Sequence, residues 1–166
     1  MKVGDVIPSA TVAIVKADQN GVFSHETVNT AEYFFNKKVV LFGYLSVMTR
    51  TSTATHYAEF IEAADEIKSH GADEIFAVSL TDPSATKAFA HHLGATHEIN
   101  FMADGNHEFS KALGIEIQPR IAMLGVRNKR FSMLIEGNEI VEFNCEEGTK
   151  LTEKSGAQTL LRQIKN

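Results

Sequence analysis

Residues 38–60 read KVVLFGYLSVMTRTSTATHYAEF, and they combine a strand, a loop and the start of a helix. Residues 38–44 are almost all apolar and include β-branched and aromatic side chains, which predicts a core strand. Hydroxyl residues then gather at 49, 51, 52 and 53, just before apolar residues that recur at helical spacing. A strand that leads into a helix N-terminus is a common way to build an anion or thiolate site, because the helix dipole and free N–H groups favour negative charge.

Ser52 stands where this arrangement would suit a cysteine. An alcohol stays protonated at neutral pH, so Ser52 gains little from the helix dipole. His56 lies four residues further on and on the same helix face, which raises the alternative of a Ser–His nucleophile. That chemistry also needs a third, orienting group, and no Gly-x-Ser-x-Gly elbow surrounds Ser52. We therefore expect helix capping from Ser52 rather than nucleophilic catalysis.

The rest of the chain alternates between strand and helix patterns. We expect strands at residues 11–16, 38–44, 75–80, 101–102, 130–136 and 139–146, and helices at 30–35, 52–70, 83–92, 108–113 and 153–164. Gly71 is a fitting end for the long helix, and Gly137-Asn138 predicts a two-residue hairpin turn. This order predicts a single α/β domain over residues 1–166, with a central mixed β-sheet flanked by helices.

Several stretches of the chain resemble the type II peroxiredoxins, the subfamily that includes the fifth mammalian form. They are KVGDVIPSATV (2–12), KKVVLF (37–42), DEIFAVSLTD (73–82), ADGNHEFSKALG (103–114) and GVRNKRFSMLIEGNEI (125–140). The resemblance implies a redoxin domain with a thioredoxin fold. It also implies reduction of hydrogen peroxide and alkyl hydroperoxides by a peroxidatic cysteine.

The chain departs from the family at the site itself. The family motif Pro-x-x-x-Thr-x-x-Cys corresponds to residues 45–52, LSVMTRTS, so Thr49 is kept while Leu45 and Ser52 replace the proline and the cysteine. Ser52 cannot supply the missing sulfur chemistry, because an alcohol is not oxidised to a sulfenic acid. The resemblance places the peroxide-holding arginine at Arg130 and gives Thr49 a hydrogen bond to peroxide. A basic residue at a strand end and a capping threonine are the plainer alternatives.

Cys145 is the only cysteine of the chain. Alternation in the last predicted strand places it on one face with Val141 and Phe143, which indicates a small buried hydrophobic residue. The neighbouring Glu146 should raise the pKa of the thiol. Glu153 stands where the mammalian form carries its resolving cysteine, so no internal disulfide cycle is expected.

Composition narrows the remaining function classes. The chain has 166 residues, 43% of them hydrophobic, and a formal net charge of −5, which argues against nucleic acid binding. No apolar run approaches the roughly 20 residues of a membrane span. A single cysteine excludes a disulfide framework, and we expect a cytoplasmic protein. His91, His92 and His97 lack partners at ligand spacing, so we expect no metal and no cofactor.

Two functions stay open. The first is a peroxiredoxin homologue that has lost its peroxidatic cysteine, has no peroxidase activity, and acts by binding a protein partner or a small anion. The alternative is an active thiol peroxidase, reduced by thioredoxin or glutaredoxin, in which a natural cysteine has been changed experimentally to Ser52. The resemblance implies a homodimer in both cases.

Overall fold

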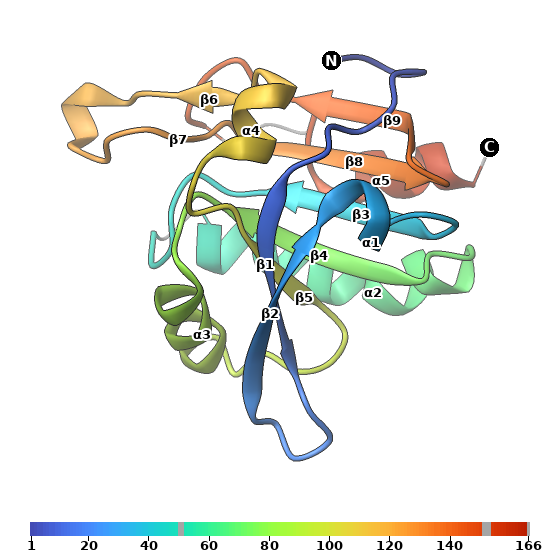
Figure 1. Ribbon diagram of the computed structural model, residues 1–166, viewed down its shortest axis with the longest axis horizontal. Coiled ribbons are helices and arrows are strands. Elements are labelled where there is room, and N and C mark those ends of the chain that lie inside the picture. The colour runs from blue at the N-terminus through green and yellow to red at the C-terminus, as the bar shows by residue number, and fades with distance from the viewer. Residues whose placement is uncertain (50–51, 151–153, 166) are drawn as a thin grey trace.

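A mixed seven-stranded sheet in the order β2-β1-β5-β4-β3-β8-β9 forms the centre of the computed structural model, which describes residues 1–49, 52–150 and 154–165 (Figure 1). Its strands are β1 (Thr11–Ala17), β2 (Phe23–Asn29), β3 (Lys38–Gly43), β4 (Glu74–Ser79), β5 (Asn100–Ala103), β8 (Phe131–Glu136) and β9 (Glu139–Cys145). The helices are α1 (Thr30–Tyr33), α2 (Ala58–Ser69), α3 (Pro83–His92), α4 (Glu108–Leu113) and α5 (Ala157–Ile164). The predicted α/β class, a thioredoxin fold with a flanked mixed sheet, is confirmed.

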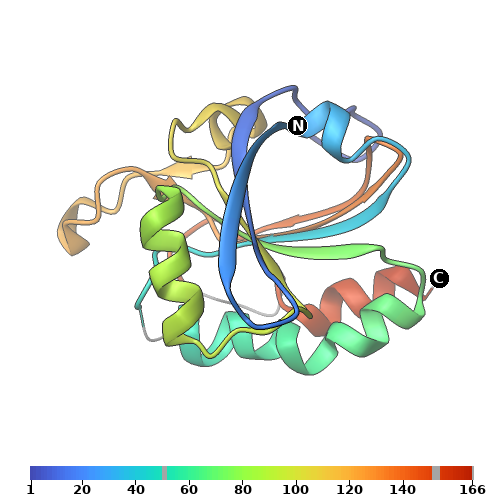
Figure 2. The ribbon, with the colours of Figure 1, turned by 60° about the horizontal axis from the view of Figure 1, so that its bottom comes forward.

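Strand β3 lies inside the sheet, parallel to β4 and antiparallel to β8. Its apolar run is continuous because both of its faces are buried. Val40 and Phe42 belong to the core cluster under α2, α3 and α5, whereas Val39 and Leu41 belong to the cluster on the opposite face. Figure 2 shows the same division, with α1 and α4 on the other side of the sheet. None of the helices within the described residues is long and apolar enough to cross a membrane.

The helix after β3 differs from the prediction of one α-helix over residues 52–70. Residues Ser52–Tyr57 form a π-helical segment, and the α-helix proper begins at Ala58. The wider turn brings two consecutive side chains, His56 and Tyr57, into the core, where they are 0% and 5% exposed. Such local widening of a helix is frequent at functional sites. The predicted end is confirmed: Gly71 follows the last turn with a left-handed φ of 91°.

Five further elements differ from the sequence prediction. Strand β2 was not expected, because exposed residues fill its middle and leave no alternating pattern. The short elements β6 (Glu116–Ile117), η2 (Arg120–Ala122) and β7 (Arg127–Asn128) are too brief for any periodicity. The last helix begins at Ala157, after an extended Gly156, rather than at residue 153, which lies outside the described residues.

Strands β8 and β9 form the predicted hairpin, with Gly137 and Asn138 both at positive φ. A bulge then changes the register, because Ile135 pairs with Ile140 while Leu134 pairs with Glu142. The bulge leaves Val141 unpaired, and its side chain packs on the α2 side of the sheet. Cys145 packs against the opposite cluster. The expectation that Val141 and Cys145 share a face is therefore wrong, since the extra residue inverts the alternation.

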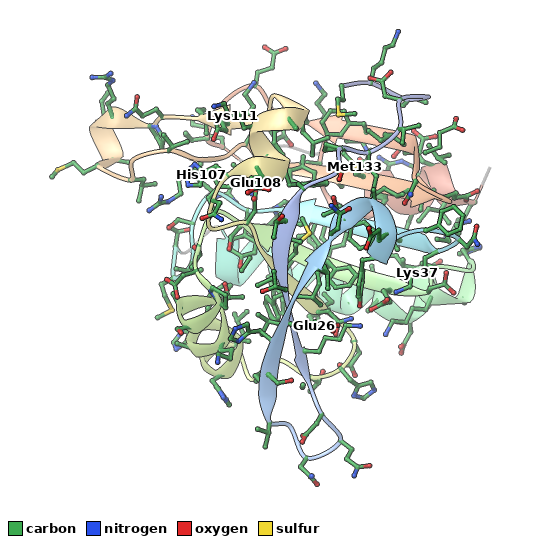
Figure 3. The ribbon with its side chains drawn as sticks, in the orientation of Figure 1. Glu26, Lys37, His107, Glu108, Lys111 and Met133 are labelled. Carbon is green, nitrogen blue, oxygen red and sulfur yellow. The ribbon has the colours of Figure 1, made fainter. Side chains whose placement is uncertain are left out.

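Carboxylates hold α4 against the first strand. Figure 3 shows Glu108 on α4 near His107 and Lys111, and its Oε2 accepts a hydrogen bond from the backbone N–H of Thr11 at 2.9 Å. The buried Asp104 accepts from the backbone N–H groups of Phe109 and Ser110 at 3.3 and 2.8 Å. The bonds to Asp104 satisfy donors at the start of α4 that would otherwise lack partners, and the bond to Glu108 joins the helix to the start of β1.

Replacement of Gly43 should test how tightly β3 and β8 approach each other. A Cβ on Gly43 would overlap the ring of Phe131, its fully buried cross-strand partner. Because a packed core resists such overlap, Gly43→Ala should lower the free energy of unfolding by about 1–3 kcal/mol in urea denaturation. Gly105→Ala is the control, since its Cβ would meet backbone atoms only at 3.6 Å. A Gly43→Ala protein as stable as the control would contradict this packing.

Candidate functional site

A pocket of about 750 Å³ opens where the end of β3 meets the start of β8. Its walls come from the loop after β3, from the η2 segment, from the residue before β8, and from the segment that follows β9. The lining residues are Leu45, Thr49, Gln118, Pro119, Arg120, Ile121, Ala122, Arg130, Thr149 and Lys150. The pocket thus brings together side chains from distant parts of the sequence.

The loop after β3 supplies one wall. Leu45 is 7% exposed, and Met48 takes a left-handed φ of 60°. Thr49 follows this turn, and its Oγ1 donates to the carbonyl oxygen of Ser46 at 3.3 Å. Of the three predicted site residues, Thr49 and Arg130 therefore line one pocket. Ser52 is the first residue of the π-helical segment, and its side chain lies outside the described part of the chain.

Arg130 is the most deeply buried charge of the pocket, with only 2% of its surface exposed. Its Nε donates to the carbonyl oxygen of Thr149 at 3.0 Å, and its own carbonyl accepts from the N–H of Glu146 at 2.9 Å. Burial lowers the pKa of the guanidinium, while the charge of Glu146 opposes that shift. Arginine nevertheless stays protonated in proteins, so Arg130 presents a permanent positive charge.

A polar network lies behind Arg130. The Oε1 of Glu146 accepts from the N–H and the Oγ of Ser155 at 3.0 and 2.9 Å. The carbonyl oxygen of Ser155 lies 3.2 Å from Nε2 of His56. Burial, together with the charge of Arg130, lowers the pKa of His56 to about 4, so the ring is neutral near pH 7 and Nε2 donates to Ser155.

The properties of His56 bear on the Ser–His alternative. A base with a pKa about 4 accepts a proton poorly near neutral pH, so His56 is poorly suited to activate an alcohol. Its Nδ1 has no hydrogen-bond partner among the described residues. The Oε1 of the nearby carboxylate, Glu146, is bound to Ser155. The arrangement does not support a serine nucleophile.

Cys145 lies on the other face of the sheet from Arg130. It pairs with Phe131 and packs in the same cluster, whereas Arg130 and Glu146 are the next pair and alternate to the opposite face. Burial is the main cause that raises the pKa of the Cys145 thiol, and the charge of Glu146 adds to it. The direction predicted for this pKa is confirmed, and the thiol is not part of the pocket wall.

Sequence reasoning missed the wall formed by residues 118–122 and by Thr149 and Lys150. The first of these segments belongs to an arm, β6 to β7, that extends from the body of the molecule (Figure 1). Ile121 and Met123 on this arm are 103% and 89% exposed. Apolar side chains next to Pro119, in a segment without periodicity, were the available signal. Within the described residues, no three histidine, cysteine or acidic side chains gather as metal ligands.

Comparisons with known proteins extend over almost the whole chain. The model of the Redoxin family matches residues 2–161. Peroxiredoxin-2B of Arabidopsis thaliana is 35% identical over 162 residues, which cover 98% of this chain and 97% of that protein. Reduced Prx3 of Vibrio vulnificus in complex with H₂O₂ superposes with a TM-score of 0.85 at 33% identity and 99% coverage of both chains. Peroxiredoxin 5 of Alvinella pompejana gives a TM-score of 0.79 at 26% identity, covering 99% of this chain and 98% of that one.

The buried, neutral His56 should make stability depend on pH. Its pKa falls from 6.5 to about 4 on folding, so between these values the unfolded chain binds a proton that the folded chain does not. The free energy of unfolding should therefore fall as the pH drops through this window, by up to about 1.4 kcal/mol per pH unit. Urea denaturation at about pH 7 and about pH 4.5 measures the effect.

The variant His56→Gln isolates this contribution, because an amide can still donate to Ser155 but does not titrate. Its stability should change less between the two pH values than that of the unaltered chain. His92→Gln is the matched control, since it removes an exposed histidine and should keep the pH dependence. Equal pH slopes for His56→Gln and the unaltered chain would contradict the buried neutral state.

Proposed function

Because this chain belongs to the redoxin family and is a peroxiredoxin, we propose that it keeps the peroxide pocket of its relatives but uses it for binding. The resemblance of residues 45–52 to the family motif supports this proposal, because Ser52 corresponds to the peroxidatic cysteine in that motif. The peroxidase cycle requires a thiolate that attacks peroxide and becomes a sulfenic acid, and an alcohol offers no equivalent oxidation. On this proposal the chain does not turn over peroxide.

The position of Cys145 is the observation that supports the proposal most directly. It is the only cysteine of the chain, and its side chain packs on the face of the sheet opposite to Arg130. Its raised pKa further lowers the fraction of thiolate near neutral pH. A thiol placed in this way cannot take over the role of a sulfur at position 52 without a rearrangement of the sheet.

The pocket itself supports a binding role. Arg130 keeps a permanent positive charge beneath walls that include the apolar Leu45 and Ile121. Such a combination of apolar walls and a few polar groups is typical of small-molecule sites. We also propose the homodimer that the family implies. Met123, an exposed apolar side chain on the same arm but not among the pocket-lining residues, favours such an interface.

The alternative remains an active thiol peroxidase, reduced by thioredoxin or glutaredoxin, in which Ser52 has replaced a natural cysteine. Similarity over nearly the full length to peroxiredoxins, one of them solved with H₂O₂, favours it. A cysteine codon at position 52 of the natural gene would decide for this alternative.

Peroxide consumption tests the proposal directly. The purified chain should consume no more H₂O₂ or alkyl hydroperoxide, with dithiothreitol as reductant, than its Cys145→Ser variant does. Ser52→Cys should restore turnover if Thr49 and Arg130 still form the peroxide site, because it returns a thiol to the N-terminal end of the helix. Turnover by the unaltered chain that disappears in Cys145→Ser would overturn the proposal and make Cys145 the working thiol.

A further inference from the structure

We infer that the pocket binds an organic carboxylate with an apolar body, and that Arg120 and Lys150 provide the selection for its negative charge. The inference rests on the proposed binding function, because it names the ligand class of the same pocket. Three properties of the pocket carry it: the charge of its walls, the apolar surface beside that charge, and its size.

The pocket walls are cationic, although the chain as a whole has a formal net charge of −5. Arg120, Arg130 and Lys150 line the pocket, and no carboxylate side chain is among the lining residues that the structure describes. The nearby charge of Glu146 offsets part of the charge of Arg130. Arg120 and Lys150 are exposed, and no ion pair joins either of them to another described residue. Lys150 also lines a neighbouring cavity together with Glu146 and Glu147, so Arg120 carries the least compensated positive charge of the pocket and Lys150 adds to it.

Apolar surface faces the same space. Leu45, Pro119, Ile121 and Ala122 line the pocket together with the cations. Ile121 is fully exposed to water, so a ligand with an apolar body that covered it would remove this surface from solvent. A small inorganic anion would leave the apolar wall wet, whereas an uncharged apolar molecule would leave the cations without a partner. Only a ligand with both a negative charge and an apolar body would contact both the cations and the apolar wall.

The size of the pocket agrees with a small organic molecule. Its volume of about 750 Å³ falls within the range of roughly 300 to 1,000 Å³ that is typical of such sites. A carboxylate fits the donor geometry of an arginine fork, which can bind both of its oxygens. The side chains of Gln118 and Thr149 add further polar groups to the walls. The carboxylate head would lie among the cations, and its chain would lie along Ile121 and Leu45.

Octanoate is the probe for this inference, and isothermal titration calorimetry on the full chain is the measurement. Octanoate should bind at least about ten-fold more tightly than acetate or inorganic phosphate, which lack the apolar body, and than octylammonium, which has the opposite charge. Affinity for octanoate should also fall with added salt, because part of the attraction is between exposed charges. Equal binding of octanoate and octylammonium would overturn the charge selection.

Substitutions locate the binding to this pocket. Arg120→Gln and Lys150→Gln should each weaken octanoate binding about three- to ten-fold, since each removes one charge-assisted contact. Lys111→Gln is the matched control, because it removes the same charge from an exposed position on α4, outside the pocket walls (Figure 3). Ile121→Ser should weaken the binding of octanoate more than the binding of acetate. Circular dichroism of each variant verifies that the fold is kept.

The outcomes separate this inference from the proposed function. If octanoate fails to bind, or if Lys111→Gln weakens it as much as Arg120→Gln and Lys150→Gln do, the carboxylate inference is wrong. The peroxide assay is independent of that result. A chain without peroxide turnover and without octanoate binding would keep the proposed loss of peroxidase activity but not this ligand class.

Discussion

The pairing of β3 with β8 is the constraint on which the site depends. Gly43 at the end of β3 lies opposite Phe131 at the start of β8, and no side chain separates the backbone of the first from the ring of the second. The loop that carries Thr49 therefore leaves the sheet at the place where Arg130 enters it. Thr49 and Arg130 are far apart in the sequence, but they line one pocket because these two central strands meet there.

The fold could be predicted from the sequence wherever local pattern and burial agree. Strand β3 is apolar along its length because both of its faces are buried, and α3 begins at Pro83 after a capping Asp82 whose carboxylate accepts two backbone N–H groups. Prediction failed where tertiary packing overrides local pattern. The bulge at Val141 and the π-helical turn before Ala58 each shift the following side chains by one position. Periodicity in the sequence does not predict such a shift.

Only part of the candidate site could be predicted from the sequence. Family resemblance pointed to Thr49 and Arg130, and both line the pocket. The arm that carries Arg120 and Ile121 gave no signal, because its strands have two residues each. The bonds that link Glu146 to Ser155 and Ser155 to His56 join segments far apart in the chain. Contacts of this kind depend on topology, and local sequence patterns carry little information about them.

On the proposed function, Arg130 explains why the pocket would outlast a loss of sulfur at position 52. A buried guanidinium is stable only where hydrogen bonds and an opposite charge compensate for the loss of water. Thr149 and Glu146, which both lie in the segment after β9, contribute to that compensation. A change of cysteine to serine at position 52 would leave these two supports in place. The positive charge and its apolar surroundings would then persist after the redox chemistry had gone, available to a ligand that binds by charge and apolar contact alone.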